Sequence, residues 1–356
     1  MILAGGAGER FWPASRRERP KQFLRVVGDQ TLLEATLARA RRFARGDRIW
    51  IVCGAEHAKA VRKESGLPAS RVLVEPRRRN TAMASAWASH RVLRVDRDAV
   101  VAVLAADHHV PDASAFAKDI RLAARAAAEA GVLVTLGVRP TRPETGYGYI
   151  QAGDRVDDLP RLRQVRRFVE KPDHKTARRY LKRGDYRWNA GIFIWQASAF
   201  LAEVERHAPD VHRALAPFRK PGGHTRKAVE AAFRRAPSLP VDVAVMERSD
   251  RVWTLPVDFA WSDVGTWLSL AEQLGVGRPG KAGKAGGNRV LGGEALLEDA
   301  QNNLVWAGDR LVALLGVEDL VVVDTEDVIF VTKLDGESDV RRLVAKLRDA
   351  GREELT

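Results

Sequence analysis

Short apolar runs alternate with longer amphipathic stretches along the first half of the chain. An uninterrupted apolar run of roughly four to eight residues is typical of a buried strand, whereas apolar residues that recur every three or four positions are typical of a helix. We therefore expect strands at residues 49–53, 72–74, 100–104 and 132–137, and helices at residues 32–43, 56–65, 81–93 and 113–130. Thr31 and Glu34 have the spacing of a capping box at the start of the first helix. The alternation predicts an α/β fold with a mostly parallel sheet and helices on both faces.

The pattern becomes less regular after residue 140 and changes again near residue 276. We expect strands at 163–170 and 191–195 and helices at 176–183, 200–207 and 228–235, as a continuation of one domain over residues 1–275. A Gly/Lys-rich stretch, residues 276–287, predicts a linker. Short apolar runs then follow at 295–297, 304–307, 311–315, 320–323 and 328–332, and a last helix is expected at 340–350, after Ser338 and before Gly351. Residues 288–356 therefore predict a small β module that ends in a helix.

The first strand is expected to be very short, since only Met1 and Ile2 precede the sequence Leu3-Ala4-Gly5-Gly6. In open α/β sheets, ligands bind beyond the carboxyl ends of the strands. The glycine turn at residues 5–8 lies at such an end, and so does Asp107, which closes the apolar run VVAVLAA. These two positions are the first candidates for a binding site.

The composition indicates a globular protein with a large core. The chain has 356 residues, of which 45% are hydrophobic and 29% charged, enough for one large domain and a small one. No apolar stretch approaches the roughly 20 residues that span a membrane. Glycines interrupt the N-terminal segment at once, so we expect no signal peptide and a cytoplasmic location. The one cysteine, Cys53, excludes an internal disulfide and lies in an apolar run, where a buried thiol is expected.

The formal net charge of +13 raises the question of a nucleic-acid partner. The basic residues are scattered along the chain, however, and no basic helix or ladder of basic and aromatic residues stands out. We therefore expect neither a nucleic-acid nor a membrane partner. Polyanionic substrates would equally favour a positively charged cleft.

The run LAGGAGERFWPASRRERPKQF, residues 3–23, carries the clearest chemistry. Glycines allow backbone N–H groups to approach phosphate oxygens, and successive N–H groups form an anion-binding nest. Arg10 and Lys21 follow within the same run and can neutralise charge that develops on those oxygens. The combination predicts a nucleoside triphosphate site. The alternative is a glycine-rich turn followed by a solvated basic loop.

Two common phosphate-binding loops are excluded. A dinucleotide-binding turn requires G-x-G-x-x-G, but here Gly6 and Gly8 are followed by Phe11 instead of a third glycine. The nearest match to a P-loop, GVGRPGKA at residues 275–282, ends in Ala282, which has no hydroxyl for magnesium, and no strand precedes it. We interpret that segment as part of the linker.

The motif in residues 3–23 resembles the opening of the sugar nucleotidyltransferases, LAGG-x-G-x-R followed by P-K-Q. The segments FWP and PKQF are most similar to the sequences of the branch that uses mannose 1-phosphate. The resemblance implies a Rossmann-like, GT-A-like mixed sheet followed by a short left-handed β-helix. It also implies transfer of a guanylyl group from GTP to mannose 1-phosphate, with Mg²⁺ as cofactor and GDP-mannose and diphosphate as products.

The resemblance assigns roles to the residues around the triphosphate. Arg10 and Lys21 are the expected catalytic cations, and Asp107 and Asp263, the latter in the motif WSDVGTW, are the expected metal ligands. The residues expected to bind the nucleotide are Leu3, Ala4, Gly5, Gly6, Gly8, Glu75, Asn80, Thr81 and Asp107. Asp107 is too far from the helix at residue 113 to cap it, whereas Asp263 could instead cap a helix at 266–274.

Several of these residues have alternative roles. Guanine presents N1–H and N2–H₂ donors, which suits an acceptor such as Glu75 or a backbone carbonyl. Asn80 and Thr81 could bind base or ribose or cap the helix that begins there. His108 and His109 suggest a zinc site, but no further ligand lies at zinc-binding spacing, so loop packing or substrate contacts are favoured. Arg16 and its neighbouring arginines are weaker candidates for phosphate binding.

Three further segments match the sugar-binding part of the family: PETGYGYI, FVEKP and WNAGIF. The residues expected to bind the sugar phosphate are Gly146, Tyr147, Glu170, Lys171, Asn189 and, from PVDVAVME, Asp242. Buried donors and acceptors can discriminate hexose epimers because the wrong epimer leaves them unpaired. For each of these residues the alternative is a role in a turn or hairpin.

Two alternatives to this function remain open. The first is a nucleotidyltransferase for another base or hexose. The second is a non-catalytic protein that senses sugar nucleotides, although retention of Arg10, Lys21, Asp107 and Asp263 argues against it. Exposed edges of the β module could pair two copies into a homodimer.

Overall fold

The computed structural model describes residues 1–6, 8–219, 223–276, 287–334 and 339–356. It divides into two compact units that do not follow the chain in order. Unit 1 comprises Met1–Gly5, Thr36–Ala106 and Val110–Trp261, and unit 2 comprises Gly6–Ala35, Asp107–His109 and Ser262–Thr356. The linker expected at residues 276–287 lies almost wholly outside the described residues, and the domain boundaries expected there stay a prediction.

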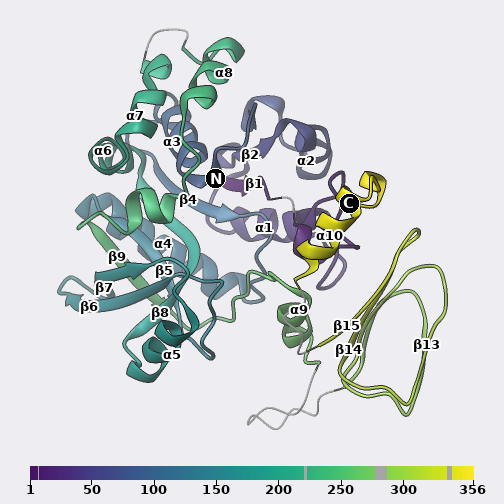
Figure 1. Ribbon diagram of the computed structural model, residues 1–356. Coiled ribbons are helices and arrows are strands. Elements are labelled where there is room, and N and C mark those ends of the chain that lie inside the picture. Colours follow the sequence, from purple (N-terminus) through teal and green to yellow (C-terminus); the bar gives the residue numbers. More distant parts are fainter. Residues whose placement is uncertain (7, 220–222, 277–286, 335–338) are drawn as a thin grey trace. The chain divides into compact units, whose positions relative to one another are not determined.

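Unit 1 is built on a nine-stranded mixed sheet (Figure 1). Its strands, in spatial order, are β3 (Val72–Glu75), β2 (Ile51–Gly54), β1 (Ile2–Ala4), β4 (Val100–Ala105), β8 (Tyr186–Gln196), β5 (Leu133–Val138), β9 (Val252–Val257), β7 (Leu159–Val169) and β6 (Tyr149–Val156). The strands β3, β2, β1 and β4 are parallel to one another, whereas β8 runs antiparallel to both β4 and β5. Beyond β4 only β5 and β9 pair in parallel, and the other pairings are antiparallel. The expectation of a mostly parallel sheet is therefore wrong for this half, because pairing with a strand from far along the chain leaves no local signal.

Helices cover both faces of this sheet around β5. All six residues of β5 are buried, and successive side chains of a strand point to opposite faces. The α-helices of the chain up to residue 261 are α1 (Leu32–Arg41), α2 (Ala58–Ser65), α3 (Asn80–Leu93), α4 (Ala113–Ala130), α5 (His174–Arg183), α6 (Ala197–His207), α7 (Pro209–Ala214) and α8 (Arg226–Arg235). A π-helical turn, η7, spans Asp242–Met246. Within the described residues, no helix has the length and apolar character needed to cross a membrane.

Several local expectations are confirmed. Thr31 and Glu34 form the capping box: each side chain accepts the backbone N–H of the other, at 2.8 and 3.1 Å. The strand β1 has three residues and lies between β2 and β4. Cys53 is fully buried, and burial raises the pKa of its thiol to about 12. The expectation that no basic helix stands out is wrong for α5, which carries Lys175, Arg178 and further cations in ten residues.

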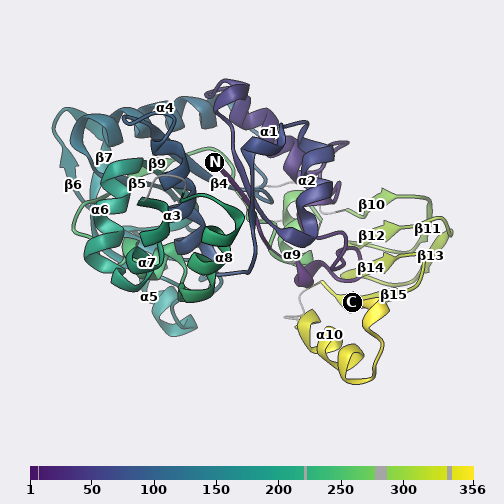
Figure 2. The same cartoon turned by 90° about the horizontal axis from the view of Figure 1, so that it is seen from above.

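Unit 2 contains a β-helix-like module (Figure 2). Its strands are β10 (Arg289–Gly292), β11 (Ala295–Glu298), β12 (Leu304–Ala307), β13 (Val312–Leu315), β14 (Leu320–Asp324) and β15 (Ile329–Lys333). The strands β10, β12 and β14 pair in parallel, β15 adds antiparallel to β14, and β11 pairs in parallel with β13. Successive turns of the module lie so close that a Cβ at Gly292 would sit 2.3 Å from the carbonyl oxygen of Ala307. The all-β expectation for this part of the chain is confirmed.

A buried asparagine and an apolar core hold unit 2 together. The fully buried Asn303 donates to Asn288 and Val317 and accepts from the backbone of Leu320, so it links three successive turns. The helices α9 (Trp267–Gln273) and α10 (Val340–Asp349) contribute to one core with the strands and the N-terminal loop. Phe11 belongs to this core and packs on Trp267 with a centroid distance of 4.8 Å. The signature loop, residues 6–23 of the N-terminal motif, is thus part of unit 2.

Candidate active site

The signature loop of unit 2 requires glycine at position 8. Gly8 has φ +67°, and a Cβ placed there would lie 2.6 Å from the Cβ of Lys21 and 2.7 Å from its backbone nitrogen. The carbonyl of Gly8 accepts hydrogen bonds from the Ser15 hydroxyl, at 2.6 Å, and from the Phe11 N–H, at 2.9 Å. The turn at Gly8 therefore fixes the backbone of Lys21 directly beside it.

Lys21 connects three segments of unit 2. Its side chain is only 6% exposed, and its ammonium donates to Asp107 Oδ2 at 2.9 Å and to the backbone carbonyl of Asp263. An ammonium carries three N–H donors, and these bonds use two of them. Lys21 is thus brought together with the two expected metal ligands. Asp107 lies 86 positions and Asp263 lies 242 positions after it in the chain.

A two-bond bridge explains how the carboxylate segments meet. The N–H of His109 donates to the carbonyl of Ser262 at 2.9 Å, and the N–H of Ser262 donates back to His109 at 3.0 Å. Asp107 and Asp263 are each within two residues of this bridge. His109 thus serves the loop through its backbone, in line with the loop role favoured from the sequence.

The electrostatics keep the Asp107 carboxyl ionised. Burial by itself would raise its pKa, but the charges of Lys21 and His108 and the hydrogen bond from Lys21 outweigh burial, and the pKa lies below its ordinary value. An ionised carboxylate is what a divalent cation requires of a ligand.

The loop around Asp263 is strained. Val264 has φ +44°, which is unfavourable for a β-branched residue, and its N–H donates to the Ser262 hydroxyl at 2.9 Å. Asp263 Oδ1 accepts the N–H of Gly265 at 2.9 Å, and a Cβ at Gly265 would lie 2.5 Å from Asp263 Oδ2. Strain of this kind concentrates at functional sites, where the surrounding structure holds it.

The helix-capping alternative for Asp263 is excluded. The N-cap of α9 is Thr266, whose hydroxyl accepts the N–H of Ser269 at 3.1 Å. The N-cap of α4 is Asp112, which accepts the N–H groups of Ser114 and Ala115. Neither Asp107 nor Asp263 is therefore needed to begin a helix.

The donor set of this site fits a hard divalent cation. Asp107 and Asp263 offer carboxylate oxygens, the ligands that Mg²⁺ prefers, and Mg²⁺ commonly takes its remaining ligands from substrate phosphates and water. Among the residues that the structure describes, no three His, Cys, Asp or Glu side chains gather into a metal-binding group. A cation bound by these two carboxylates would thus be completed by a bound nucleotide.

Arg10 differs from Lys21 in its surroundings. It is exposed and makes no hydrogen bond or ion pair with any residue in the described part of the chain. Gly6, also exposed, has no atom within 4 Å of a Cβ placed on it. Both positions are open to an incoming phosphate group.

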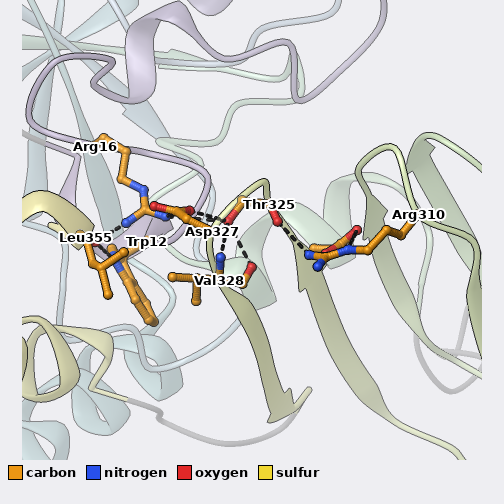
Figure 3. Close-up of polar contacts among 8 residues, drawn as sticks. Trp12, Arg16, Arg310, Thr325, Asp327, Val328 and Leu355 are labelled. Atoms are coloured by element: carbon orange, nitrogen blue, oxygen red, sulfur yellow. Dashed lines mark hydrogen bonds and ion pairs between the residues drawn. The ribbon is translucent and has the colours of Figure 1, made fainter.

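Arg16, a weaker candidate for phosphate binding, has a structural role (Figure 3). Its guanidinium donates to Asp327 Oδ1 at 2.6 Å and to the backbone carbonyl of Leu355. Trp12 Nε1 donates to the same carbonyl at 2.6 Å. These bonds tie the signature loop to the turn between β14 and β15 and to the segment after α10, so the Arg16 guanidinium is already paired.

In unit 1, Glu75 ends the edge strand β3 and is 7% exposed. Its Oε1 is buried without a hydrogen-bond partner among the described residues, and its Oε2 would lie 3.7 Å from a Cβ at Gly5. Burial, with a smaller effect from the Glu56 charge, raises the pKa of Glu75 to about 7. The side chain is a buried acceptor that lacks a donor.

Asn80 and Thr81, at the start of α3, are both hydrogen-bonded, one to its neighbour and the other to a distant segment. Asn80 has φ +59°, and its Oδ1 accepts the N–H of Thr81 at 2.8 Å. The hydroxyl of Thr81 accepts the N–H of Val241 at 2.8 Å. Of the remaining nucleotide candidates, Leu3 and Ala4 belong to β1.

The sugar candidates of unit 1 form a connected group. The buried Thr135 hydroxyl donates to Asn189 Oδ1 at 2.9 Å, and Asn189 Nδ2 donates to Asp242 Oδ1 at 2.8 Å. Lys171, with φ +47°, pairs with Glu170 at 2.9 Å. Burial, followed by the charge of Glu170, raises the pKa of Asp242 to about 7. The structure thus gathers four of the six candidates into one network.

The other two sugar candidates lie on the turn before β6. Tyr147 packs edge-on against Trp188 and Trp261, with centroids 5.2 Å apart in both pairs. The N–H of Gly146 is already bound by Glu144 Oε1 at 2.9 Å. Gly148, two positions on, gives the network its room: a Cβ there would lie 2.5 Å from Glu170 Oε2.

Sequence reasoning missed three supporting residues: Thr135, Glu144 and Glu247. Glu247 accepts the N–H of Glu170 at 2.6 Å and follows the π-helical turn that carries Asp242. Such π-turns occur frequently at functional sites, but their sequences carry no distinct pattern. Glu144 and Glu247 had a signal, since they belong to the segments PETGYGYI and PVDVAVME that were singled out for other residues, whereas Thr135 had none.

Known proteins match this chain over nearly its full length. The nucleotidyl transferase family matches residues 1–274, and the MannoseP isomerase/GMP-like β-helix domain matches residues 293–347. The chain is 39% identical to the xanthan biosynthesis protein XanB of Xanthomonas campestris, over all of this chain and 74% of that protein. It is 37% identical to a mannose-1-phosphate guanylyltransferase of Escherichia coli, over 99% of this chain and 74% of that protein.

A solved structure agrees with these sequence matches. A Thermus thermophilus protein, described as a mannose-1-phosphate geranyltransferase, superimposes with a TM-score of 0.87 at 34% identity and covers 98% of both chains. The expected Rossmann-like mixed sheet and β-helix-like module are thereby confirmed. The chain therefore belongs to the nucleotidyl transferase family.

Proposed function

We propose that this nucleotidyltransferase transfers the guanylyl group of GTP to mannose 1-phosphate and releases GDP-mannose and diphosphate. The relatives from Escherichia coli and Vibrio cholerae are named for this activity, the latter as a putative enzyme. The observation that carries the proposal is the position of Lys21, whose ammonium contacts Asp107 and the backbone of Asp263 beside the signature turn. These are the residue types that phosphoryl transfer requires at one place.

The reaction needs positive charge and alignment, because both substrates are anions. A phosphate oxygen of mannose 1-phosphate attacks the α-phosphorus of GTP in line, and the bond to the diphosphate leaving group breaks. No covalent enzyme intermediate is needed. The backbone N–H groups of the loop around Gly6 and Gly8 bind the triphosphate, and Arg10 and the third donor of Lys21 stabilise charge on its oxygens.

Asp107 and Asp263 would hold Mg²⁺, which would neutralise phosphate charge when the nucleotide is bound. The chain's own contribution is to keep these carboxylates in place through Lys21 and the bridge between His109 and Ser262. Removal of divalent cations with EDTA should abolish activity, and Mg²⁺ should restore it.

Guanine specificity would come from Glu75. Its partnerless buried carboxyl can accept from the N1–H and N2–H₂ donors of guanine, which adenine does not present in the same arrangement. Asn80 and Thr81 stay candidates for contacts to the nucleotide, as do Leu3, Ala4 and Gly5.

Hexose specificity would come from the network of Asn189, Asp242 and Glu170, with Lys171 directed to the sugar phosphate. A hexose with a misplaced hydroxyl would leave these buried groups unpaired. Gly146 and Tyr147 are proposed to line the same substrate.

The decisive assay is the initial rate of diphosphate release from GTP, ATP, UTP and dTTP, each with mannose 1-phosphate and with glucose 1-phosphate. The proposal predicts the highest kcat/KM for GTP with mannose 1-phosphate. A clear preference for another pair would identify a different sugar nucleotidyltransferase, and binding without turnover of any pair would identify a sensor.

We further propose a cytoplasmic homodimer whose contact includes the β module. Large apolar side chains are exposed there, among them Leu296, Leu311 and Leu315 at 60%, 61% and 73%. Sedimentation equilibrium should give twice the chain mass, and Leu315→Asp should shift the equilibrium to the monomer.

A further inference from the structure

A pocket of about 560 Å³ lies in unit 1, and none of the residues that line it is among those assigned to the nucleotide, the sugar or the metal. Its walls come from α2, the edge strand β3, α3 and α8. Ala58, Val72, Trp87 and Val229 give it an apolar lining. The volume is within the range of small-molecule sites, roughly 300–1,000 Å³.

The pocket carries an excess of positive charge. Arg62 and Arg91 line it without a described carboxylate partner, whereas Arg226 is neutralised by Glu230 at 3.0 Å. His224 adds no charge at neutral pH, because burial and the charge of Arg91 lower its pKa to about 4. An anion is therefore the species that this pocket favours electrostatically.

Polar atoms without partners are concentrated in the same place. Trp87 Nε1, Arg91 Nε and both ring nitrogens of His224 are buried and have no hydrogen-bond partner among the described residues. Trp87 is 4% exposed. A buried polar group that remains unpaired is destabilising, so native proteins rarely keep several together without a ligand or water.

The groups are also held rigidly. Phe218 stacks on the His224 ring, with a centroid distance of 4.9 Å and an interplanar angle of 6°, and on Trp87 at 6.4 Å. The guanidinium of Arg79 donates to the carbonyl of Phe233 at 2.7 Å and so ties the end of α8 to the start of α3. A preorganised set of donors loses little entropy when a ligand binds.

We propose that this pocket binds a small organic anion, a carboxylate or phosphate ester on an apolar body, with Arg91 and Trp87 donating to its oxygens and Arg62 providing the second charge. Donor-only groups such as indole and guanidinium require an acceptor, and oxyanions supply several. The apolar lining accounts for the body of the ligand. Water alone would satisfy the donors but not the charge.

Three matched probes test the site: 1-naphthyl phosphate, 1-naphthoate and the uncharged 1-naphthylmethanol. Isothermal titration of the full chain should show saturable binding of one or both anions, about tenfold tighter than of the alcohol. Binding of the phosphate alone would assign a phosphate ester, and binding of the carboxylate alone a carboxylate. Arg91→Gln should weaken anion binding about tenfold, since one charge-assisted hydrogen bond is lost.

The control is Lys63→Gln, which removes one positive charge from α2 beside Arg62 but does not line the pocket. It should leave the Kd for the anions unchanged, as should Lys21→Ala in the signature loop. Trp87→Phe keeps an aromatic side chain but removes the indole N–H, and as a second variant it should also weaken anion binding. The inference is wrong if neither anion binds, if Lys63→Gln weakens binding as much as Arg91→Gln, or if Lys21→Ala abolishes it, since the last result would place the anions in the substrate site.

Discussion

Replacement of Glu75 by glutamine should stabilise the protein in a pH-dependent way. The buried carboxyl has no hydrogen-bond partner for Oε1 among the described residues, and burial raises its pKa from 4.5 to about 7. The folded protein therefore binds this proton more tightly than the unfolded chain does. The wild-type free energy of unfolding must decrease as the pH rises between these two values, because ionisation in the buried site is unfavourable.

The size of this change in the free energy of unfolding follows from the pKa shift of Glu75. One pKa unit corresponds to about 1.4 kcal/mol, so a change from 4.5 to about 7 costs the wild type about 3 kcal/mol once the pH is above 7. Between pH 5 and pH 8 the cost grows by about 2–3 kcal/mol. Glu75→Gln does not titrate and avoids this cost. Its Tm advantage over the wild type should therefore increase by about 3–5 °C between these pH values.

The assay is differential scanning calorimetry of both proteins at pH 5 and pH 8. Glu129→Gln, which removes an exposed carboxylate from α4, is the control and should show no such change with pH. An equal Tm difference between Glu75→Gln and wild type at both pH values would refute the claim that Glu75 is an unfavourably buried acid. The same variant should raise the KM for GTP about tenfold, since a carboxylate acceptor is lost.

Four further substitutions test unit 2, three of them at its phosphate site and one at the structural residue Arg16. Lys21→Ala should lower kcat about 100-fold or more in the diphosphate-release assay, because a preorganised cation is lost; a rate near that of the wild type would contradict its role. Asp263→Ala should keep the circular dichroism spectrum and Tm of a folded protein but reduce turnover by orders of magnitude with Mg²⁺ as the only divalent ion, and normal turnover would remove it from the metal site. Gly8→Ala should reduce both Tm and kcat, since its Cβ would lie 2.6 Å from Lys21; unchanged kinetics would show that the turn tolerates a side chain. Arg16→Gln should lower Tm by about 2–5 °C through loss of its bonds to Asp327 and Leu355, whereas Arg17→Gln, an exposed neighbour, should not.

Local sequence signals predicted the elements that depend on neighbouring residues. The capping box at Thr31 and the strand over residues 304–307 are found as expected, because a helix start and a short apolar run are encoded within a few positions. The strands β6 and β9 were not predicted as ranges. Only two of the eight residues of β6 are buried, and β9 contains Pro256, so neither has the pattern of a buried strand.

The site was predictable as a set of residues but not as an arrangement. The motifs predicted Lys21, Asp107 and Asp263 as site residues. The contact of Lys21 with both aspartates, however, depends on the backbone bridge between His109 and Ser262, which no sequence pattern encodes. The motif ranked Arg10 above Arg16, but only tertiary structure shows that Arg16 is paired with Asp327 while Arg10 is exposed. Long-range pairing of this kind decides which charged residue is available to a substrate.

The most direct test of the account is a crystal structure of the protein with GTP and Mg²⁺. The account predicts the triphosphate against the backbone of Gly6 and Gly8, within reach of Arg10 and Lys21, and the cation bound by Asp107 and Asp263. A nucleotide bound away from the signature loop, or a cation that touches neither carboxylate, would contradict it.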